Sequence, residues 1–363
     1  MDLALKKINP LPVSTWNLLG INDADINGDI AKAAPYKGEY LSELPEGVTV
    51  SQKTVYAPEI ETGMGDNARR FSETNKNCGV TLRVKAGTKA EKPVFLKYKV
   101  NSENPSVVDV NGIVAEDGSE ITVVAEYSSE SGIKGFHGGL TKIYAGKNAA
   151  VNLIQVQMIS DSCVNFDNIG GVAEENAAIN IVQAQLGAKE TYSGCKVKLL
   201  GVKSSLNIDT VYFGDKKRKI DINYVAEHIG KKTKSNIQVN GALTDESSKT
   251  FRGTIDFLKG AKKAVGHENE YNLLFSGKVR SRTAPLILCA EEDVEGQHAA
   301  ATGKIDQNRL FYLMSRGLSE TDAKKLIIKA QFQPVVEKIP DPSVQDAIFD
   351  YVKERLDSVE SIS

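Results

Sequence analysis

Apolar and polar residues alternate in short segments along the middle of the chain. In the segment 148–158 (NAAVNLIQVQM), Val151 and Leu153 occupy alternate positions with Asn152 between them, and the segment 176–186 (NAAINIVQAQL) repeats this order. Successive side chains of a β-strand point to opposite faces, so a period of two predicts strands with one apolar face. The middle of the chain is therefore predicted to consist mainly of strands.

These segments also recur at a fixed spacing. The first two lie 28 residues apart, and SSLNIDTVYFG at 204–214 follows the second copy at an offset of 27. Weaker copies lie at 119–127 and 218–228. A fixed period indicates stacked coils, because one strand cannot bury its apolar face alone whereas stacked copies form a continuous core. A β-sandwich is the alternative, but sandwiches rarely repeat their residues at a fixed offset, and the six-residue rhythm of a hexapeptide solenoid is absent.

Near the C-terminus the apolar spacing becomes helical. The segment 307–315 (QNRLFYLMS) predicts a helix that ends before Gly317, and Ser319 predicts the N-cap of a second helix. A third helix is predicted from Asp341, with Pro342 in its first turn. The apolar stripes of these helices have two interpretations: they cap the open end of the solenoid, or they form a docking surface for a partner.

Three regions follow from these patterns. We expect an N-terminal segment at 1–77 that is partly helical or irregular, a β-solenoid core at 78–305 and a helical subdomain at 306–363. Within the first region, Trp16 is interpreted as an anchor, and the polar, glycine-bearing segment 61–72 (ETGMGDNARRFS) predicts a surface loop.

The charge balance favours protein partners over polyanions. Lys and Arg total 45 and Asp and Glu total 47, a net charge of −2, which provides no overall basic field for nucleic acid and no polybasic membrane patch. No apolar run approaches the ~18 residues that span a bilayer, and the N-terminus has no stretch of signal-peptide type. Isolated cysteines are typical of a reducing compartment, so a cytoplasmic location is expected. The four are Cys78, Cys163, Cys195 and Cys289.

Residues that could carry chemistry are sparse. The sequence contains no Walker-type phosphate loop and no G-x-S-x-G nucleophile elbow, and the glycine cluster 135–140 (GFHGGL) is interpreted as a strand turn. The histidines lack zinc-site spacing, but His298 ends an acidic segment, AEEDVEGQH, and could help to hold iron. A β-helix enzyme acting on polysaccharide is the alternative from another class. No acidic cluster repeats along one sheet face, so a non-enzymatic protein is predicted.

Four segments from Tyr224 onward resemble the SufB/SufD family of iron–sulfur cluster assembly proteins. YVAEHIGKKTKSNIQVNGAL at 224–243 has the family's His, Gly, Thr and Ser, here His228, Gly230, Thr233 and Ser235. KTFRGTIDF at 249–257 has its F/Y-R-G strand. The most distinctive block is APLILCAEEDVEGQHAAATGKID at 284–306 with LFYLMSRGLSETDAKKLIIKAQF at 310–332.

The resemblance implies a fold and a set of partners. The fold would be mainly β, a right-handed parallel β-helix (β-solenoid) between helical ends. The C-terminal helices would bind the ABC-type ATPase SufC, the end of the β-helix would pair SufB with SufD, and nascent clusters would form with SufB. The residues predicted to dock the ATPase are Phe311, Tyr312, Arg316, Leu326, Ile327 and Phe332.

Motif details make the chain most similar to SufD. SufB-like chains have Cys-Asp where this chain has Glu270 and Tyr271, and a Glu where it has Ala299. SufD-like chains keep a lone His, which His298 matches; the Cys that often precedes it by two residues is replaced by Gly296. The resemblance therefore implies that His298 contributes to cluster and metal binding at the SufB interface.

The same resemblance sets the remaining expectations. No stably bound cofactor is expected, only a transient iron–sulfur cluster shared with a partner. That partner would be a SufB-type paralogue or a second copy of this chain, and a self-associating scaffold that works with SufC alone is the remaining alternative. No nucleic-acid or membrane partner is expected. The chain looks shorter than typical family members, mostly in N-terminal helical sequence.

Overall fold

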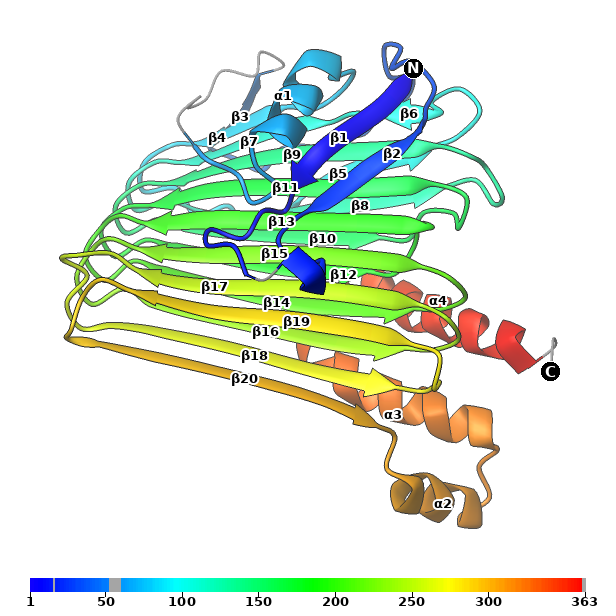
Figure 1. The fold of residues 1–363 in the computed structure, drawn as a ribbon. Helices are drawn as coiled ribbons and strands as arrows, with labels where there is room; N and C mark the ends of the chain where they lie inside the picture. Colours follow the sequence, from blue (N-terminus) through cyan, green and yellow to red (C-terminus); the bar gives the residue numbers. More distant parts are fainter. Residues whose placement is uncertain (16, 52–59, 361–363) are drawn as a thin grey trace.

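The molecule is a stack of coils that each pass once through two parallel sheets (Figure 1). The computed structural model describes residues 1–15, 17–51 and 60–360; Trp16 lies outside the described residues. The eight-stranded sheet contains β5 (Val94–Val100), β8 (Glu120–Ser129), β10 (Ala150–Gln157), β12 (Ala178–Gln185), β14 (Ser205–Gly214), β16 (Lys234–Leu243), β18 (Ala264–Leu274) and β20 (Val294–Lys304). The ten-stranded sheet contains β3 (Val48–Ser51), β4 (Thr81–Val84), β6 (Ser106–Val107), β7 (Val110–Ala115), β9 (Phe136–Ala145), β11 (Val164–Ala173), β13 (Glu190–Leu199), β15 (Lys219–His228), β17 (Ser248–Phe257) and β19 (Arg280–Cys289).

The repeat in the sequence is the coil of the solenoid. Asn152 on β10 pairs in register with Asn180 on β12, which pairs with Asn207 on β14. Their side chains form a ladder, with Asn180 donating to Asn152 and Asn207 donating to Asn180, both at 2.8 Å. Similar sequence copies therefore lie on adjacent parallel strands, which confirms the predicted β-solenoid and excludes the β-sandwich.

The apolar face of each strand lines the interior. Val151 and Leu153, predicted to share a face, are buried beside Ile179 and Ile181 of the next coil. In-register stacking places equivalent side chains over one another along the whole core, so each coil completes the burial of its neighbours.

Three helices follow the last strand, as predicted. They are α2 (Gln307–Ser315), α3 (Glu320–Val336) and α4 (Pro342–Glu360). The Ser319 hydroxyl oxygen accepts a hydrogen bond from the Asp322 backbone N–H at 3.0 Å, which confirms the predicted N-cap of α3. Within the described residues, no helix combines the length and the apolar character that crossing a bilayer requires.

The helices α3 and α4 do not cap the end of the solenoid. Their apolar stripes, which include Phe332 and Ile348, are buried against outward-facing residues of the eight-stranded sheet such as Val182 and Phe213. Figure 1 shows both helices beside this sheet, while β20 remains at the end of the stack. The end-capping interpretation is therefore wrong: the outward side chains of this sheet are themselves apolar, and the helices cover them.

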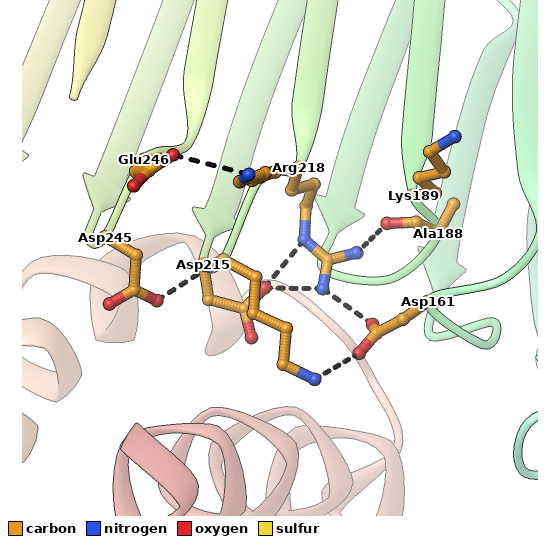
Figure 2. Close-up of a pocket in the computed structure, with 9 residues that line it drawn as sticks. Asp161, Ala188, Lys189, Asp215, Arg218, Asp245 and Glu246 are labelled. Carbon is orange, nitrogen blue, oxygen red and sulfur yellow. Dashed lines mark hydrogen bonds and ion pairs between the residues drawn. The ribbon is translucent and has the colours of Figure 1, made fainter. Parts of the chain in front are cut away.

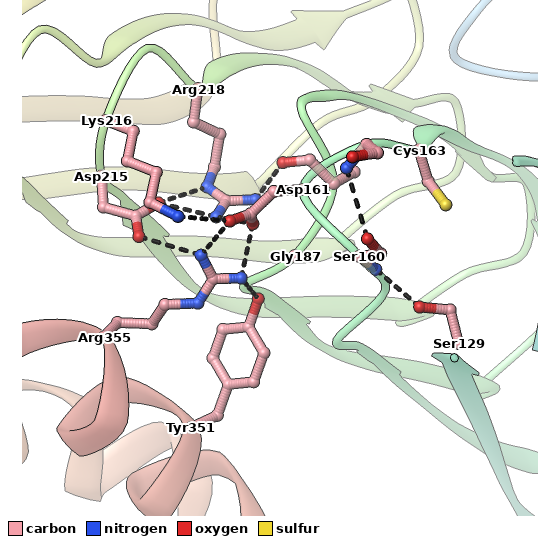
Figure 3. Close-up of polar contacts among 12 residues, drawn as sticks. Ser129, Ser160, Asp161, Cys163, Gly187, Asp215, Lys216, Arg218, Tyr351 and Arg355 are labelled. Carbon is pink, nitrogen blue, oxygen red and sulfur yellow. Dashed lines mark hydrogen bonds and ion pairs between the residues drawn. The ribbon is translucent and has the colours of Figure 1, made fainter. Parts of the chain in front are cut away.

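An ionic cluster fixes α4 to the turns of the solenoid (Figure 3). Arg355 on α4 pairs with Asp161 and, at 3.1 Å, with Asp215. The buried Arg218 donates to Asp215 at 2.6 Å and to Asp161 at 3.0 Å. Two arginines thus neutralise two carboxylates from different coils, and one of them, Arg355, ties α4 to both coils.

A cavity of about 510 Å³ lies beside this cluster (Figure 2). Asp161, Asp215 and Arg218 belong to its lining, and Lys216 pairs with Asp161 at 2.8 Å. Asp161, Asp215, Lys216 and Arg218 pair with one another, so these four charges anchor the helix and are not free for a ligand.

The N-terminal region packs on the outer face of the ten-stranded sheet. It contains an antiparallel pair, β1 (Asp2–Ile8) and β2 (Ala24–Asp29), the 3-10 turn η1 (Asn17–Leu19) and α1 (Asp66–Asn75). The prediction of a surface loop at 61–72 is wrong. Gly63 and Met64 are inserted against the sheet, and a Cβ on Gly63 would lie 2.0 Å from the Cys195 backbone nitrogen. The glycine serves close packing here, not a flexible loop.

Candidate functional site

The C-terminal end of the solenoid is open. In β20 every residue from Glu295 to Lys304 is exposed, and within the described part of the chain β20 pairs with β18 alone. The facing end strand, β19, is half-buried along most of its length. Among the described residues, no element covers this edge, which leaves the outer backbone N–H and C=O groups of a long strand without protein partners.

The interior becomes polar as it approaches this end. The buried row that contains Ile208 and Ile237 continues with Glu268 on β18 and then His298 on β20, each paired in register with the residue before it. In-register residues of parallel strands share one face, so His298 occupies an interior position. It is nevertheless exposed, because no further coil follows it.

Glu270, two residues after Glu268, is held by three neighbours. Its carboxylate accepts from the Lys249 ammonium group, from the Thr283 hydroxyl at 2.6 Å and from the Tyr212 hydroxyl at 3.3 Å. Burial lowers the pKa of Lys249, and the charge of Glu270 acts against that shift. Glu270 and Lys249 are therefore a buried pair with a closed set of hydrogen bonds.

Glu268 lacks such partners. It is 2% exposed, and its Oε2 atom has no hydrogen-bond partner among the described residues. Its carboxyl group lies over Gly253 on the facing sheet, where a Cβ would come within 2.3 Å of the Glu268 Cδ atom. Burial, together with the charge of Glu270, raises the pKa of Glu268 to about 8, and Lys249 offsets part of this effect. Glu268 therefore carries a proton at neutral pH.

The surroundings of His298 differ from the sequence expectation. Glu295 of the acidic segment lies 3.7 Å from His267 Nε2, on the neighbouring strand. The described residues contain no group of three or more His, Cys, Asp or Glu side chains placed to hold a metal ion. His298 thus offers a single exposed imidazole, and additional ligands would have to come from outside this chain.

The predicted ATPase-docking residues fall into two groups. Phe311 is 73% exposed and Tyr312 is 62% exposed on α2, and Leu326 on α3 and Arg316 are exposed as well. Met314 on α2 is a further exposed apolar residue that the sequence reading missed. In contrast, Ile327 is half-buried and packs against the core cluster around Ile305 and Leu310, and Phe332 is fully buried against the sheet. Phe332 therefore cannot contact a partner in this structure.

The four residues of the first family-like segment have a structural role. His228 Nδ1 lies 2.7 Å from the Thr233 hydroxyl and Nε2 lies 2.9 Å from the Ser235 hydroxyl. Gly230 packs so closely on the preceding turn that a Cβ would lie 2.4 Å from the Gly201 carbonyl oxygen. Burial lowers the pKa of His228 to about 4. The segment fixes one turn of the solenoid around a neutral, buried histidine.

The buried His228 predicts a loss of stability in acid. Its folded pKa lies below the usual value of 6.5, so the unfolded chain takes up a proton that the folded chain does not. The contribution of the neutral His228 to the free energy of unfolding is complete above pH 6.5. It falls by about 1.4 kcal/mol per pH unit as the pH decreases to about 4. We expect the His228→Gln variant to have a lower free energy of unfolding in urea than wild type at pH 7. Between pH 6.5 and 4 this free energy should change less with pH than that of wild type. His267→Gln, at a partly exposed histidine, is the control; equal slopes for all three proteins would contradict the prediction.

The remaining candidates lie inside the stack. The segment 135–140 is not a turn: from Phe136 onward it forms β9, and His137 is buried between Asp109 at 2.6 Å and Asn165 at 2.5 Å. Local glycine content suggested a turn, but these glycines leave room for neighbouring side chains, as Gly138 does for two phenylalanine rings.

The cysteines divide between interior and end. Cys163 and Cys195 are buried, and burial raises the pKa of both thiols, to about 11 for Cys163. Cys78 is half-buried, and Cys289 is exposed on the last strand of the ten-stranded sheet. Thiols with raised pKa values are weak nucleophiles, so the two buried cysteines act as small apolar residues of the core.

Comparisons with known proteins agree with the motifs. A family model described as "SUF system FeS cluster assembly, SufBD core domain" matches residues 98–331. The chain is 28% identical to the iron–sulfur cluster assembly protein SufD of Bacillus subtilis over 282 residues, 77% of this chain and 64% of that protein. It is 29% identical to a SufBD family protein of Pyrococcus horikoshii over 265 residues, 73% of this chain and 59% of that protein. A SufBD family protein of Staphylococcus epidermidis is 23% identical over 349 residues, 90% of this chain. The chain thus spans less than two thirds of the length of the first two relatives.

Proposed function

This chain belongs to the SufBD family of iron–sulfur cluster assembly proteins and is most like SufD; from that premise we propose that it pairs end to end with a SufB-type chain and recruits a SufC-type ATPase. It acts as a scaffold subunit, not as an enzyme. Its four unpaired cysteines support a cytoplasmic location.

The open end of the solenoid is the observation that carries this proposal. A long exposed edge strand is a template for pairing with another strand, and monomeric proteins normally protect such edges. The end strand of a second solenoid would satisfy the free backbone groups of β20 and would cover the interior-facing His298. The iron–sulfur cluster, as cargo, would then be held by His298 together with ligands of the partner.

The C-terminal helices support the second half of the proposal. Phe311, Tyr312 and Leu326 are exposed apolar residues on α2 and α3, and exposed apolar side chains on helices are typical of a helical contact with another protein. Because Arg355 fixes α4 to two coils, movement of an ATPase bound at this surface would act on the solenoid as well.

Two other functions remain as alternatives. A self-associating scaffold would use the same open end to pair with a second copy, and the mass of the isolated chain in solution separates it from the heteromeric model. A polysaccharide-cleaving β-helix enzyme receives little support, because the interior carboxylates Glu268 and Glu270 are sealed from solvent and could not reach a polymer.

One substitution tests the pairing directly. Ala300 faces the interior at the open end, in register with Glu270, whereas Ala299 faces outward. Ala300→Glu leaves a carboxylate in water in the single chain but buries it in the pair, so we expect co-purification with the SufB-type chain to fall about tenfold or more. Ala299→Glu has the same size and charge and should pair normally. Retained pairing in Ala300→Glu would contradict the end-to-end model.

Two further variants separate the roles of the two surfaces. Phe311→Ser with Tyr312→Ser should abolish co-purification with the ATPase and leave pairing intact, whereas Leu18→Ser with Leu19→Ser, at exposed leucines elsewhere, should affect neither. His298→Ala should lower the iron and sulfide content of the purified complex without dissociating it, and His267→Ala should not. Unchanged cluster content in His298→Ala would remove the proposed role of that residue.

A further inference from the structure

Three successive turns of the solenoid carry six exposed lysines. The turns connect β13 to β14 (200–204), β15 to β16 (229–233) and β17 to β18 (258–263), and contain no acidic residue. We call these residues the lysine ridge: Lys203, Lys231, Lys232, Lys259, Lys262 and Lys263.

The ridge lysines are stacked by the backbone. The Lys203 N–H donates to the Lys231 carbonyl at 2.9 Å, and the Lys232 N–H donates to the Lys262 carbonyl at 2.8 Å. Adjacent coils lie ~4.8 Å apart, so the six charges fall within roughly 10 Å along the solenoid axis. Like charges stacked on adjacent strands are unfavourable, and the fold itself gains nothing from this arrangement.

The ammonium groups of the ridge have no ion-pair or hydrogen-bond partner among the described residues. Some lysines on other coils are paired; Lys196 and Lys198, for example, both bind Glu61. The net charge of −2 for the whole chain conceals this local excess. The ridge is therefore a local excess of positive charge whose ammonium groups make no direct ion pair within the described residues.

The neighbouring turns limit what can bind. Glu174 and Glu175 lie on the turn before the ridge, and the turn after it (290–293) contains three acidic residues. At one end of the ridge Leu200 is 45% exposed and Val202 is 40% exposed. The basic surface is thus only three coils wide, has acidic residues on both sides and carries two apolar side chains.

These features distinguish between classes of anion. A membrane surface extends beyond three coils and would repel the flanking acidic turns, which lie within a Debye length of about 10 Å at 0.1 M salt. Nucleic acid is bound through arginine and aromatic stacking as well as lysine, and the three turns contain neither. A small phosphate would need free backbone N–H groups, but those of Lys203 and Lys232 donate within the solenoid.

We propose that the lysine ridge docks an acidic segment of a partner protein that also presents an apolar side chain to Leu200 and Val202. An α-helix is about 10–12 Å in diameter, which matches the width of three coils. Carboxylates along one face of such a helix would meet the stacked ammonium groups and remove their mutual repulsion. The ridge ends one coil before the last turn of the solenoid and includes no residue of β20 or α2, so the inference does not rest on the proposed function.

A synthetic helical peptide with glutamates along one face and a leucine at its end is the probe. We expect it to bind the full-length chain, measured by fluorescence anisotropy, with an affinity that falls steeply with salt. The variant Lys231→Glu, Lys259→Glu, Lys262→Glu should weaken binding about tenfold or more. It avoids Lys203, Lys232 and Lys263, whose φ angles of 61°, 59° and 60° would add backbone strain.

Matched controls make the result decisive. Lys85→Glu, Lys89→Glu, Lys92→Glu changes the charge equally at exposed lysines far from the ridge and should leave binding unchanged. A peptide with glutamine in place of glutamate should not bind. Thermal unfolding of both variants shows that they remain folded. The proposal would be overturned if the glutamate peptide failed to bind, or if the control variant lost as much peptide affinity as the ridge variant. It would also be overturned if phosphatidylserine vesicles or a single-stranded oligonucleotide, and not the peptide, bound in a way that depends on the ridge.

Discussion

Replacing Arg252 with methionine is expected to lower the free energy of unfolding by about 3–5 kcal/mol. Arg252 is fully buried on the outer face of β17, in the F-R-G segment. Its guanidinium group donates to Asp221 Oδ1 at 2.7 Å and to the backbone carbonyls of Ile21 and Asp23, the latter at 3.0 Å. Methionine would leave Asp221 buried with only the Asn9 amide, at 2.8 Å, as a side-chain partner.

The same substitution should release the N-terminal residues before the solenoid unfolds. Ile21 and Asp23 are held on the sheet by these hydrogen bonds, so limited proteolysis is expected to cut the chain next to them faster in Arg252→Met than in wild type. Arg282→Met is the matched control, because Arg282 is exposed and makes one long contact, 3.4 Å, to Gly20. Urea unfolding measures the stability. A loss below 1 kcal/mol, equal to that of the control, would show that the buried arginine is dispensable.

Replacing Glu268 with glutamine is expected to stabilise the protein at pH 8 and to have little effect at pH 4.5. The folded pKa, about 8, lies above the usual 4.5, so the folded chain keeps a proton that the unfolded chain loses. The contribution of Glu268 to the free energy of unfolding is therefore complete below pH 4.5. It falls by about 1.4 kcal/mol per pH unit as the pH rises to about 8. Glutamine stays neutral and avoids this loss, so the difference between the two proteins should grow with pH to several kcal/mol.

Unfolding midpoints in urea between pH 4.5 and 8.5 would measure this effect. Glu295→Gln, at an exposed carboxylate on the neighbouring strand, should follow wild type at every pH. A difference in unfolding free energy between Glu268→Gln and wild type that stays constant across this range would contradict the prediction. It would mean that Glu268 ionises at the same pH in the folded and the unfolded chain. A natural chain that retains such a group gives up stability at the open end, as functional sites commonly do.

Local periodicity predicted the repeating part of the fold because register and periodicity have the same physical origin. Asn152 and Asn180 were placed on equivalent positions from sequence alone, and they are hydrogen-bonded neighbours in the structure. The cap at Ser319 was predictable for a similar reason, since its partner lies three residues away. Such features depend only on nearby residues.

Features set by distant contacts could not be predicted in this way. Gly63 and Met64 lie in a polar segment, and only their approach to strands more than 100 residues later makes them buried. The position of α3 and α4 depends on the outward-facing residues of the eight-stranded sheet. The sequence pattern predicts that these residues belong to strands but does not show that helices cover them. Both errors arose where packing between distant segments decides the structure.

The candidate site shows the same division. His298 was identified from its motif, but Glu268 was not, because the segment HENEYN alternates in a way that does not reveal which face is buried. Only the register with Ile237 places Glu268 inside the solenoid. Stacking likewise gathers the lysine ridge from residues that are about one coil apart in sequence.

The attachment of α4 restricts how this architecture can change in length. Asp161 and Asp215 are held by one side chain, Arg355, although they lie on turns two coils apart. Insertion or deletion of a whole coil preserves the alternation of every strand, but between these two residues it would shift one carboxylate by ~4.8 Å and break the shared contact. We expect natural gain and loss of complete coils to be confined to the parts of the stack that this helix does not bridge. The length of α4 and its contacts would then fix the number of coils that it spans.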